Sequence, residues 1–402
     1  MKRGSGKAES SKKQKEQSRG DPKSASSSSE DEGPVPEEDK SMVGVKSLST
    51  VAEPMSGEKE SKLQRWAKGR ANRRDTDEST DVRDEDLPDQ SAARLHTLNA
   101  QSKTFCDQTL RKGLRPLREE FGALKRYAPD NQTIKSFFDH MSKNRYKDVM
   151  LTDETRVKLT SGGSDYIHAS YVKGINQKFI CTQGPLERTV PDFWRMIIQE
   201  KTAVVVMLCE TSDRSRRKCA EYWPRGAGEV KKITADITVT NTGVLCEPLK
   251  DRLSLYITNL TVSRGGHSQQ MIHYLWPAWP DRGAPESSVA VLELIKRVEL
   301  PSTMRPVVVH CTAGVGRTGA FTAIALGLEK LKCNEPLQGP KLLRQLRDQR
   351  LHCVQSELHY LYVHRAILEH FLEEEQLAFD KRVVKFLIAY DVHVKARSKR
   401  SE

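Results

Sequence analysis

The amino-acid sequence predicts a layered α/β or α+β fold built around one β-sheet. Two short apolar runs, VVVML (204–208) and VVVH (307–310), have the composition of buried strands. Helical patterns separate and follow these runs, and the apolar residues gather between about Leu114 and Phe371. Strands that alternate with helices pack as layers around one core. A span of about 260 residues is long enough for a single large core.

Two helices are predicted in the first half of this span. LRPLREEFGALKRY (114–127) places its leucines and its phenylalanine at spacings of three and four, which indicates an amphipathic helix. Thr189, followed by Pro191 and Asp192, predicts a capped start for a second helix.

Three more helical segments follow the second apolar run. AFTAIALGLEKL (320–331) is apolar on all sides and predicts a buried helix. Ser356 is placed to cap the helix ELHYLYVHRAILEHFLEE (357–374). A last amphipathic segment, 383–390, precedes a basic tail.

The N-terminal region, 1–104, differs from the rest in composition. It contains 20 Lys+Arg and 20 Asp+Glu and almost no apolar periodicity, so we expect a disordered polyampholyte. SKLQRWAKGRANRRD (61–75) has either the pattern of a short helix that docks on a partner or that of a frayed helix without a partner. The residues 376–402 are predicted to form a basic C-terminal extension.

The net charge of +12 comes from the folded part and the extreme C-terminus, not from the balanced N-terminal region. A mildly basic domain suits an anionic substrate, nucleic acid or an acidic membrane surface, so charge alone does not choose among them. No apolar run is long enough for a membrane span, and the N-terminus lacks the apolar core of a signal peptide. We therefore expect a cytoplasmic protein with nuclear access.

The eight cysteines include no CxxC pair and no zinc-type spacing with histidine. In a reducing compartment most of these thiols behave as small buried hydrophobes. The sequence predicts neither a metal site nor a cofactor, and it leaves room for a free reactive thiolate.

The segment VVVHCTAGVGRTG (307–319) carries the most chemical information. A strand, a glycine-bearing loop and a helix start follow one another, so inward-pointing amides and the helix N-terminus can cradle a phosphate dianion. The same field stabilises a thiolate at Cys311. Arg317, six residues further on, returns to this loop and offers a planar fork to two phosphate oxygens. The alternative is a structural cysteine at a strand end with a surface arginine, but the three glycines and the strand–loop–helix context favour the phosphate loop.

The motif HCTAGVGRTG resembles the signature loop of protein tyrosine phosphatases. Several other segments match that family in the same order: KNRYKDV (143–149), DYIHAS (165–170), TQGP (182–185), KCAEYWP (218–224), WPDRGAP (279–285) and VQSELHYLY (354–362). The resemblance covers about residues 113–375 and implies one catalytic domain with a twisted, largely mixed β-sheet flanked by helices. It also implies chemistry that needs no metal.

The resemblance implies roles for the residues of the reaction. Cys311 would attack the phosphate and Arg317 would bind it, while Asp281 would protonate the leaving tyrosine and later activate water. By the same resemblance Gln355 positions that water, and Thr318 assists departure of the sulfur. His310 would support the loop and the thiolate.

Further residues would bind the substrate. The loop backbone from Thr312 through Ala313, Gly314 and Val315 to Gly316 would contact the phosphate. Tyr146 resembles the aromatic wall of a deep cleft, Asp148 resembles the carboxylate that holds the substrate backbone, and Lys218 lies either near the substrate and acid loop or in a structural role.

Three positions depart from the family pattern. His168 stands where asparagine is usual, Thr312 where serine is commoner, and His359 where a second glutamine assists water placement. None of them removes the nucleophile, the acid or the phosphate fork. Phosphotyrosine proteins are thus the expected partners and nucleic acid is not. The competing hypotheses are a phosphotyrosine-binding protein with little turnover, and a phosphatase for phosphoinositides, RNA or phosphoserine.

Overall fold

The structure is a computed structural model, and it describes residues 97–213, 216–249, 253–281, 283–298 and 305–398. Most of the N-terminal region, including the segment 61–75, therefore lies outside the described residues. Within the described ranges, no helix combines the length and apolar character that crossing a bilayer requires.

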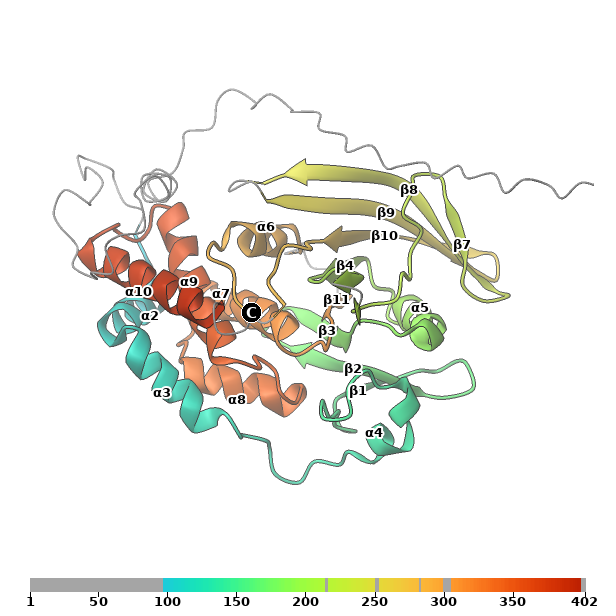
Figure 1. The fold of residues 1–402 in the computed structure, drawn as a ribbon, viewed down its shortest axis with the longest axis horizontal. Helices are drawn as coiled ribbons and strands as arrows, with labels where there is room; N and C mark the ends of the chain where they lie inside the picture. Colours follow the sequence, from blue (N-terminus) through green and yellow to red (C-terminus); the bar gives the residue numbers. More distant parts are fainter. Residues whose placement is uncertain (1–96, 214–215, 250–252, 282, 299–304, 399–402) are drawn as a thin grey trace, which may run out of the picture. The chain divides into compact units, whose positions relative to one another are not determined.

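The largest sheet of the described residues has nine strands in the order β1-β2-β3-β11-β4-β10-β9-β8-β7 (Figure 1). Its strands are β1 (Arg156–Lys158), β2 (Tyr166–Lys173), β3 (Lys178–Gln183), β4 (Val204–Met207), β7 (Val230–Lys232), β8 (Ile237–Pro248), β9 (Ser254–Arg264), β10 (His267–Leu275) and β11 (Val307–Cys311). A short hairpin, β5 (Ser212–Asp213) with β6 (Arg216–Arg217), forms a second sheet. Parallel and antiparallel pairs both occur, so the predicted mixed sheet is confirmed.

The centre of the sheet positions the phosphate loop. Strand β11 runs parallel to both β3 and β4, with Val309 opposite Cys181 on one side and Val206 on the other. All five residues of β11 are buried, as expected for a strand covered on both faces. Both predicted apolar strands are confirmed, and Cys311 is the last residue of the strand.

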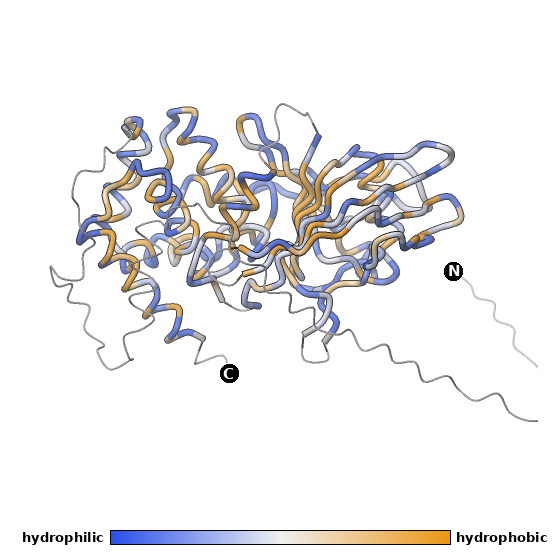
Figure 2. Tube along the Cα trace, turned by 90° about the horizontal axis from the view of Figure 1, so that it is seen from above, coloured by the Kyte–Doolittle hydropathy of each residue, from blue (hydrophilic) through white to orange (hydrophobic). Residues whose placement is uncertain are grey.

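Helices cover the sheet on both sides. They are α2 (Ala100–Lys112), α3 (Leu114–Leu124), α4 (Lys135–Asp139), α5 (Val190–Gln199), α6 (Val289–Val298), α7 (Arg317–Lys332), α8 (Gly339–Gln349), α9 (Glu357–Glu373) and α10 (Lys381–Ser398), with 3-10 turns η2 (Met141–Lys143) and η3 (Glu187–Thr189). The central strands lie between α7 and α5 (Figure 1). Figure 2 shows hydrophobic residues gathered along these strands and the neighbouring helices. The predicted fold of a sheet flanked by helices is therefore confirmed.

The folded part begins earlier than the boundary we expected at residue 104. Helix α2 starts at Ala100, and the Asn99 side chain caps it by accepting a 2.9 Å hydrogen bond from the Ser102 amide. Phe105 and Leu110 of this helix are buried in the core. Only a few apolar residues anchor α2, so its sequence has little amphipathic pattern.

The C-terminal extension is also part of the fold as far as residue 398. The predicted amphipathic segment 383–390 lies in helix α10, where Val383, Leu387 and Tyr390 are fully buried. Helix α10 packs against α2, α3 and α9. We therefore extend the proposed domain at both ends beyond 113–375.

The two predicted helix caps have different outcomes. Ser356 caps α9, since its hydroxyl accepts a hydrogen bond from the His359 amide. Thr189 precedes α5 as expected, but its side chain makes no cap bond with that helix. Its hydroxyl instead bonds to the backbone of Leu186, because the preceding 3-10 turn places those groups within 2.9–3.2 Å.

Candidate active site

The phosphate loop joins β11 to α7, which begins at Arg317. Gly314 has a φ of +71°, and a Cβ on it would lie 2.1 Å from the Thr182 carbonyl oxygen. Only glycine fits there. The Gly314 amide points inward and donates to the Cys311 sulfur at 3.3 Å. The loop thus has the inward-facing amide that the sequence predicted.

The Cys311 thiol is buried, yet its pKa is lowered. Burial raises its pKa, but the Arg317 charge, the Thr318 side chain and amide and the Gly314 amide lower it, so that the pKa falls below the ordinary thiol value. The buried Thr318 hydroxyl has no partner of normal hydrogen-bond geometry among the described residues, so it acts on the sulfur through a weak contact. By contrast, burial raises the pKa of Cys181 to about 11 and that of Cys209 to about 12.

The Arg317 guanidinium connects two loops. It is 6% exposed and donates to the Thr312 hydroxyl at 3.0 Å. It also donates to the Trp279 carbonyl at 3.3 Å and to the Asp281 carboxylate at 2.8 Å. The predicted phosphate-binding and acid residues are therefore in direct contact.

Asp281 lies between two cations. Besides Arg317, the Lys218 ammonium contacts its second carboxylate oxygen at 2.5 Å, and the Asp281 side chain stays 35% exposed. The Lys218 side chain therefore lies next to the acid loop.

His310 is fully buried beneath Cys311. Burial lowers its pKa to about 4, with a further contribution from the Arg145 and Arg317 charges. Its Nε2 lies 2.8 Å from the Tyr222 hydroxyl, and its Nδ1 lies 3.3 Å from the Cys311 carbonyl oxygen. A neutral, fixed ring fits a supporting role.

Gln355 and His359 lie beside the loop at Gly316. A Cβ on Gly316 would be 3.4 Å from the exposed Gln355 side-chain oxygen and 2.8 Å from a His359 ring carbon. Burial lowers the pKa of His359 to about 3, and its Nδ1 bonds to the Ser356 hydroxyl at 2.8 Å. His359, which stands where the family pattern has a glutamine, thus puts a neutral, buried ring against the phosphate loop.

The rim segment is attached to the same loop. Tyr146 is 40% exposed, while its neighbour Arg145 donates to the carbonyls of Gly184 and Pro185 at 2.7–3.1 Å. Gly184 in turn donates its amide to the Thr312 carbonyl at 3.0 Å. Asp148 is exposed, and its charge acts on His352. The two predicted rim residues therefore sit on a segment anchored next to Cys311.

Sequence reasoning missed Arg350, which holds the outer side of the loop. A loop whose amides face inward turns its carbonyls outward, where they need donors. The fully buried Arg350 donates to the Gly314 carbonyl at 3.2 Å and to His168 Nδ1 at 3.1 Å. His168, which stands where asparagine is usual, therefore supplies a hydrogen-bond acceptor for this arginine. The available signal in the sequence was an arginine directly before Leu351, shortly ahead of the VQSE motif.

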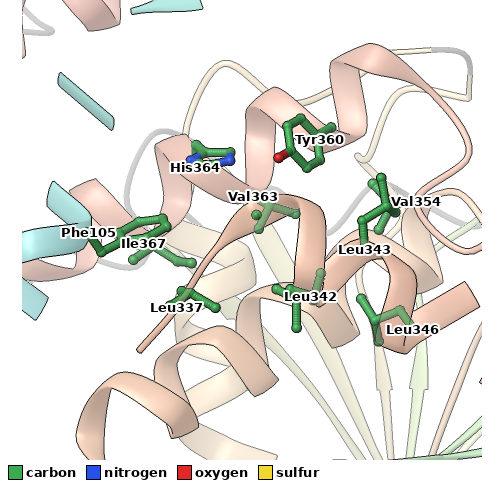
Figure 3. A pocket seen from close by; sticks show the side chains of 12 residues that line it. Phe105, Leu337, Leu342, Leu343, Leu346, Val354, Tyr360, Val363, His364 and Ile367 are labelled. Atoms are coloured by element: carbon green, nitrogen blue, oxygen red, sulfur yellow. The ribbon is translucent and has the colours of Figure 1, made fainter. Parts of the chain in front are cut away.

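An apolar pocket lies elsewhere, between α7, α8 and α9 (Figure 3). Phe105 of α2, Leu342 of α8 and Ile367 of α9 point into it, and none of its lining residues belongs to the predicted site. Across the described ranges, no group of three or more His, Cys, Asp or Glu side chains is arranged to hold a metal ion.

Comparison with known proteins agrees with this geometry. The family model described as "Protein-tyrosine phosphatase" matches residues 140–369. Receptor-type tyrosine-protein phosphatase F of Bos taurus is 38% identical over 235 residues, which are 56% of this chain and 12% of that protein. Receptor-type tyrosine-protein phosphatase R of Mus musculus is 38% identical over 241 residues, or 57% of this chain and 35% of that protein. The chain thus spans a small part of these relatives.

Solved structures share the fold. The catalytic domain of human protein tyrosine phosphatase non-receptor type 18 superposes with a TM-score of 0.60 at 26% identity, covering 67% of this chain and 99% of that one. A protein tyrosine phosphatase of Trypanosoma cruzi gives a TM-score of 0.61 at 23% identity, covering 66% and 96%. The matched family model includes both the Cys311 loop and the Asp281 loop, and this chain belongs to the protein-tyrosine phosphatase family.

Proposed function

We propose that the protein hydrolyses phosphotyrosine in other proteins through a phosphocysteine intermediate. One observation carries the proposal: the pKa of buried Cys311 is lowered next to Arg317, whereas burial raises the pKa of the neighbouring Cys209. A buried thiol whose pKa is lowered by a guanidinium ionises more readily and can act as a nucleophile, and the same guanidinium can bind the phosphate.

In the first step the phosphate enters the loop and is bound by Arg317 and the loop amides. The Cys311 sulfur forms a bond to phosphorus as the bond to the tyrosine oxygen breaks, and Asp281 gives a proton to that oxygen. The contacts of Asp281 with Arg317 and Lys218 support this role, because they keep the carboxylate beside the guanidinium that would bind the phosphate. A phosphate dianion that shares Arg317 adds negative charge there and favours the protonated carboxyl that this step needs.

In the second step water attacks phosphorus and the bond to sulfur breaks. Asp281 takes the proton of the water, and the side chain of Gln355, which lies beside Gly316, orients it. The Thr318 hydroxyl stabilises the departing thiolate, in agreement with its lowering of the thiol pKa. His310, neutral and buried, supports the loop rather than carrying protons.

Substrate choice in this proposal comes from the rim. Tyr146 would stand beside the phosphotyrosine ring, and Asp148 would accept hydrogen bonds from the substrate backbone. The anchoring of Arg145 to Gly184 and Pro185 supports this, because Gly184 is itself bonded to the Thr312 carbonyl of the phosphate loop.

The location that we propose is the cytoplasm, with access to the nucleus. Its support is that eight cysteines are free in the described residues, as in a reducing compartment. Microscopy of the tagged full chain tests this. Docking of partners through the N-terminal region stays a prediction.

The test is hydrolysis of a phosphotyrosyl peptide by the full chain in the presence of a metal chelator. We expect turnover by the wild type, none by Cys311→Ser, and unchanged turnover by Cys333→Ser, which alters an exposed cysteine. Binding of the peptide without turnover by the wild type would favour the binding-protein alternative. Faster hydrolysis of a phosphoinositide or a phosphoserine peptide would favour the other phosphatase class.

A further inference from the structure

Three buried side chains form a continuous hydrogen-bonded chain behind the nucleophile. His310 Nδ1 lies 3.3 Å from the Cys311 carbonyl oxygen, and His310 Nε2 lies 2.8 Å from the Tyr222 hydroxyl. The same hydroxyl lies 2.7 Å from Nε2 of His273 on β10. All three side chains are fully buried. The role proposed for Cys311 uses His310 but leaves His273 unexplained.

The direction of this chain follows from counting protons. Burial lowers the pKa of His310 to about 4 and that of His273 well below its usual value, so each ring is neutral and carries one N–H. A carbonyl oxygen only accepts, so the contact with Cys311 requires the proton on His310 Nδ1. His310 Nε2 must then accept from the Tyr222 hydroxyl, and the Tyr222 oxygen must accept from His273 Nε2–H.

The opposite direction is unfavourable at both ends. It would turn a lone pair of His310 Nδ1 toward the Cys311 carbonyl, and it would leave a proton on His273 Nδ1. That atom is buried and has no hydrogen-bond partner among the described residues. A buried N–H without a partner is costly, since it loses its bond to water and gains none. In the favoured direction the same atom carries only a lone pair, and every donor is satisfied.

We propose that His273 is a positioning residue for the nucleophile: its Nε2–H holds the Tyr222 hydroxyl toward His310 and so fixes the His310 tautomer that donates to the Cys311 carbonyl. The hydroxyl has a second, weaker acceptor in the Met207 sulfur at 3.8 Å, toward which it could otherwise rotate. When the Tyr222 oxygen accepts from His273, its own proton no longer points at His273, and the nearest remaining acceptor is His310 Nε2 at 2.8 Å.

The His310 tautomer affects the phosphate loop through the peptide group that joins Cys311 to Thr312. A trans peptide is planar, so fixing the Cys311 carbonyl toward His310 turns the Thr312 amide the opposite way. Gly184 closes the remaining space, since a Cβ on it would lie 2.9 Å from the Cys311 carbonyl oxygen. His273 thus helps to set the orientation of the Thr312 peptide, at which the loop begins. The Gly314 amide, which donates to the Cys311 sulfur, follows two residues later.

The direct test is the protonation of the two rings in the wild-type full chain, read from ¹⁵N chemical shifts of labelled histidines. The His273→Gln spectrum assigns the His273 signals. We expect His310 to carry its proton on Nδ1 and His273 on Nε2. A proton on His310 Nε2 or on His273 Nδ1 would overturn the proposal.

Variants then test whether the tautomer matters for the sulfur. The readout is the pKa of the Cys311 thiol, taken from the rate of alkylation by iodoacetamide against pH. We expect His273→Leu to raise it by about half a unit to one unit, the effect of one lost hydrogen bond. His273→Gln, whose amide N–H can replace Nε2–H, should restore the wild-type value. Equal shifts in the two variants, or no shift in either, would refute the positioning role.

A matched control separates this effect from general loss of packing. His364 is also buried, bonds to the Thr109 hydroxyl at 3.2 Å, and lines the apolar pocket rather than the site. His364→Leu should leave the thiol pKa unchanged. If His273→Leu does not fold, the wild-type tautomers decide alone. The inference rests on the proposed nucleophile, but neither readout needs a phosphatase substrate, so its failure is distinguishable from failure of the function.

Discussion

The loop that carries Cys311 and the loop that carries Asp281 meet at one guanidinium, yet they are held in different ways. The carbonyls of the phosphate loop are bonded from outside: Val315 accepts from the Val354 amide, Gly314 from Arg350 and Thr312 from Gly184. The carboxylate of the acid loop is partly exposed and is held by two cations.

In the described part of the acid loop, Trp279 and residues 283–285 are buried, whereas Pro280 and Asp281 between them are exposed. Trp279 packs on the Tyr362 ring at 5.1 Å, and the Tyr390 hydroxyl of α10 donates to the Pro285 carbonyl at 3.0 Å. The phosphate loop is thus held by its backbone geometry, whereas Asp281 is held by charge. Changes in the first loop should therefore remove the site, and changes in the second should alter the rate within an intact site.

The largest effect is expected from Gly314→Ala. The added Cβ would meet the Thr182 carbonyl at 2.1 Å in a backbone with φ of +71°, so the loop cannot close. We expect phosphotyrosyl-peptide hydrolysis to fall by about 10³-fold or more. Gly228→Ala is the matched control, because Gly228 has a φ of +83° but open space around it. Comparable activity in the two variants would contradict the backbone argument.

Asp281→Asn should separate rate from binding. The amide keeps the shape of the carboxyl but cannot give up a proton, so we expect kcat to fall by about 10²–10⁴-fold. Because Cys311 and Arg317 remain, KM should change little. Steady-state kinetics on the same peptide measures both values. A large rise in KM with unchanged kcat would mean that Asp281 binds substrate instead.

Arg350→Met should lower the stability of the folded chain. It leaves the carbonyl of Gly314 and the Ser170 hydroxyl without a buried donor, at a cost of about 1–3 kcal/mol for each unsatisfied group. Chemical denaturation measures the loss. The exposed Arg344, which lies over the Tyr127 ring, provides the control Arg344→Met. Equal stability of the two variants would show that Arg350 does not hold the loop.

The smallest effect is expected at the link between α10 and the acid loop. Tyr390→Phe removes one hydrogen bond to Pro285, so we expect a loss of about 0.5–1.5 kcal/mol in unfolding free energy. The kcat should change less than twofold. Tyr256→Phe, at a tyrosine that is 41% exposed, should change neither. A strong drop in kcat for Tyr390→Phe would mean that α10 controls the acid loop more tightly than its contacts indicate.

Local patterns predicted the elements of the fold that bury whole faces. The strands at 204 and 307 and the helices at 114, 320 and 357 were all visible as periodic or continuous apolar runs. Helix α2 was not, because two of its five buried residues, Ser102 and Thr109, are polar, and this weakens the apolar pattern of the sequence. The bond of Thr189 to a preceding turn depends on a backbone path that the cap pattern does not contain.

The site residues divide in the same way. The strand–loop–helix pattern predicted Cys311 and Arg317, and the family resemblance implied the acid loop with Asp281. Arg350 and His273 were missed because each acts through a contact between distant segments: Arg350 on the carbonyl of Gly314, and His273 on the hydroxyl of Tyr222. Such pairings arise from strand order, which no single segment encodes.

The decisive measurement is the pKa of the Cys311 thiol in the wild-type chain, taken from alkylation rates against pH with Cys311→Ser as the blank. We expect the thiol to ionise below about 8.5, the value of a free cysteine, and peptide hydrolysis to be lost as pH falls through that pKa. Since the folded-state pKa is lowered, the thiolate also stabilises the fold at high pH and ceases to do so as pH falls through the same value. A thiol that ionises only above 9, as is the case for Cys181 and Cys209, where burial is the largest cause, would show that the loop does not stabilise a thiolate.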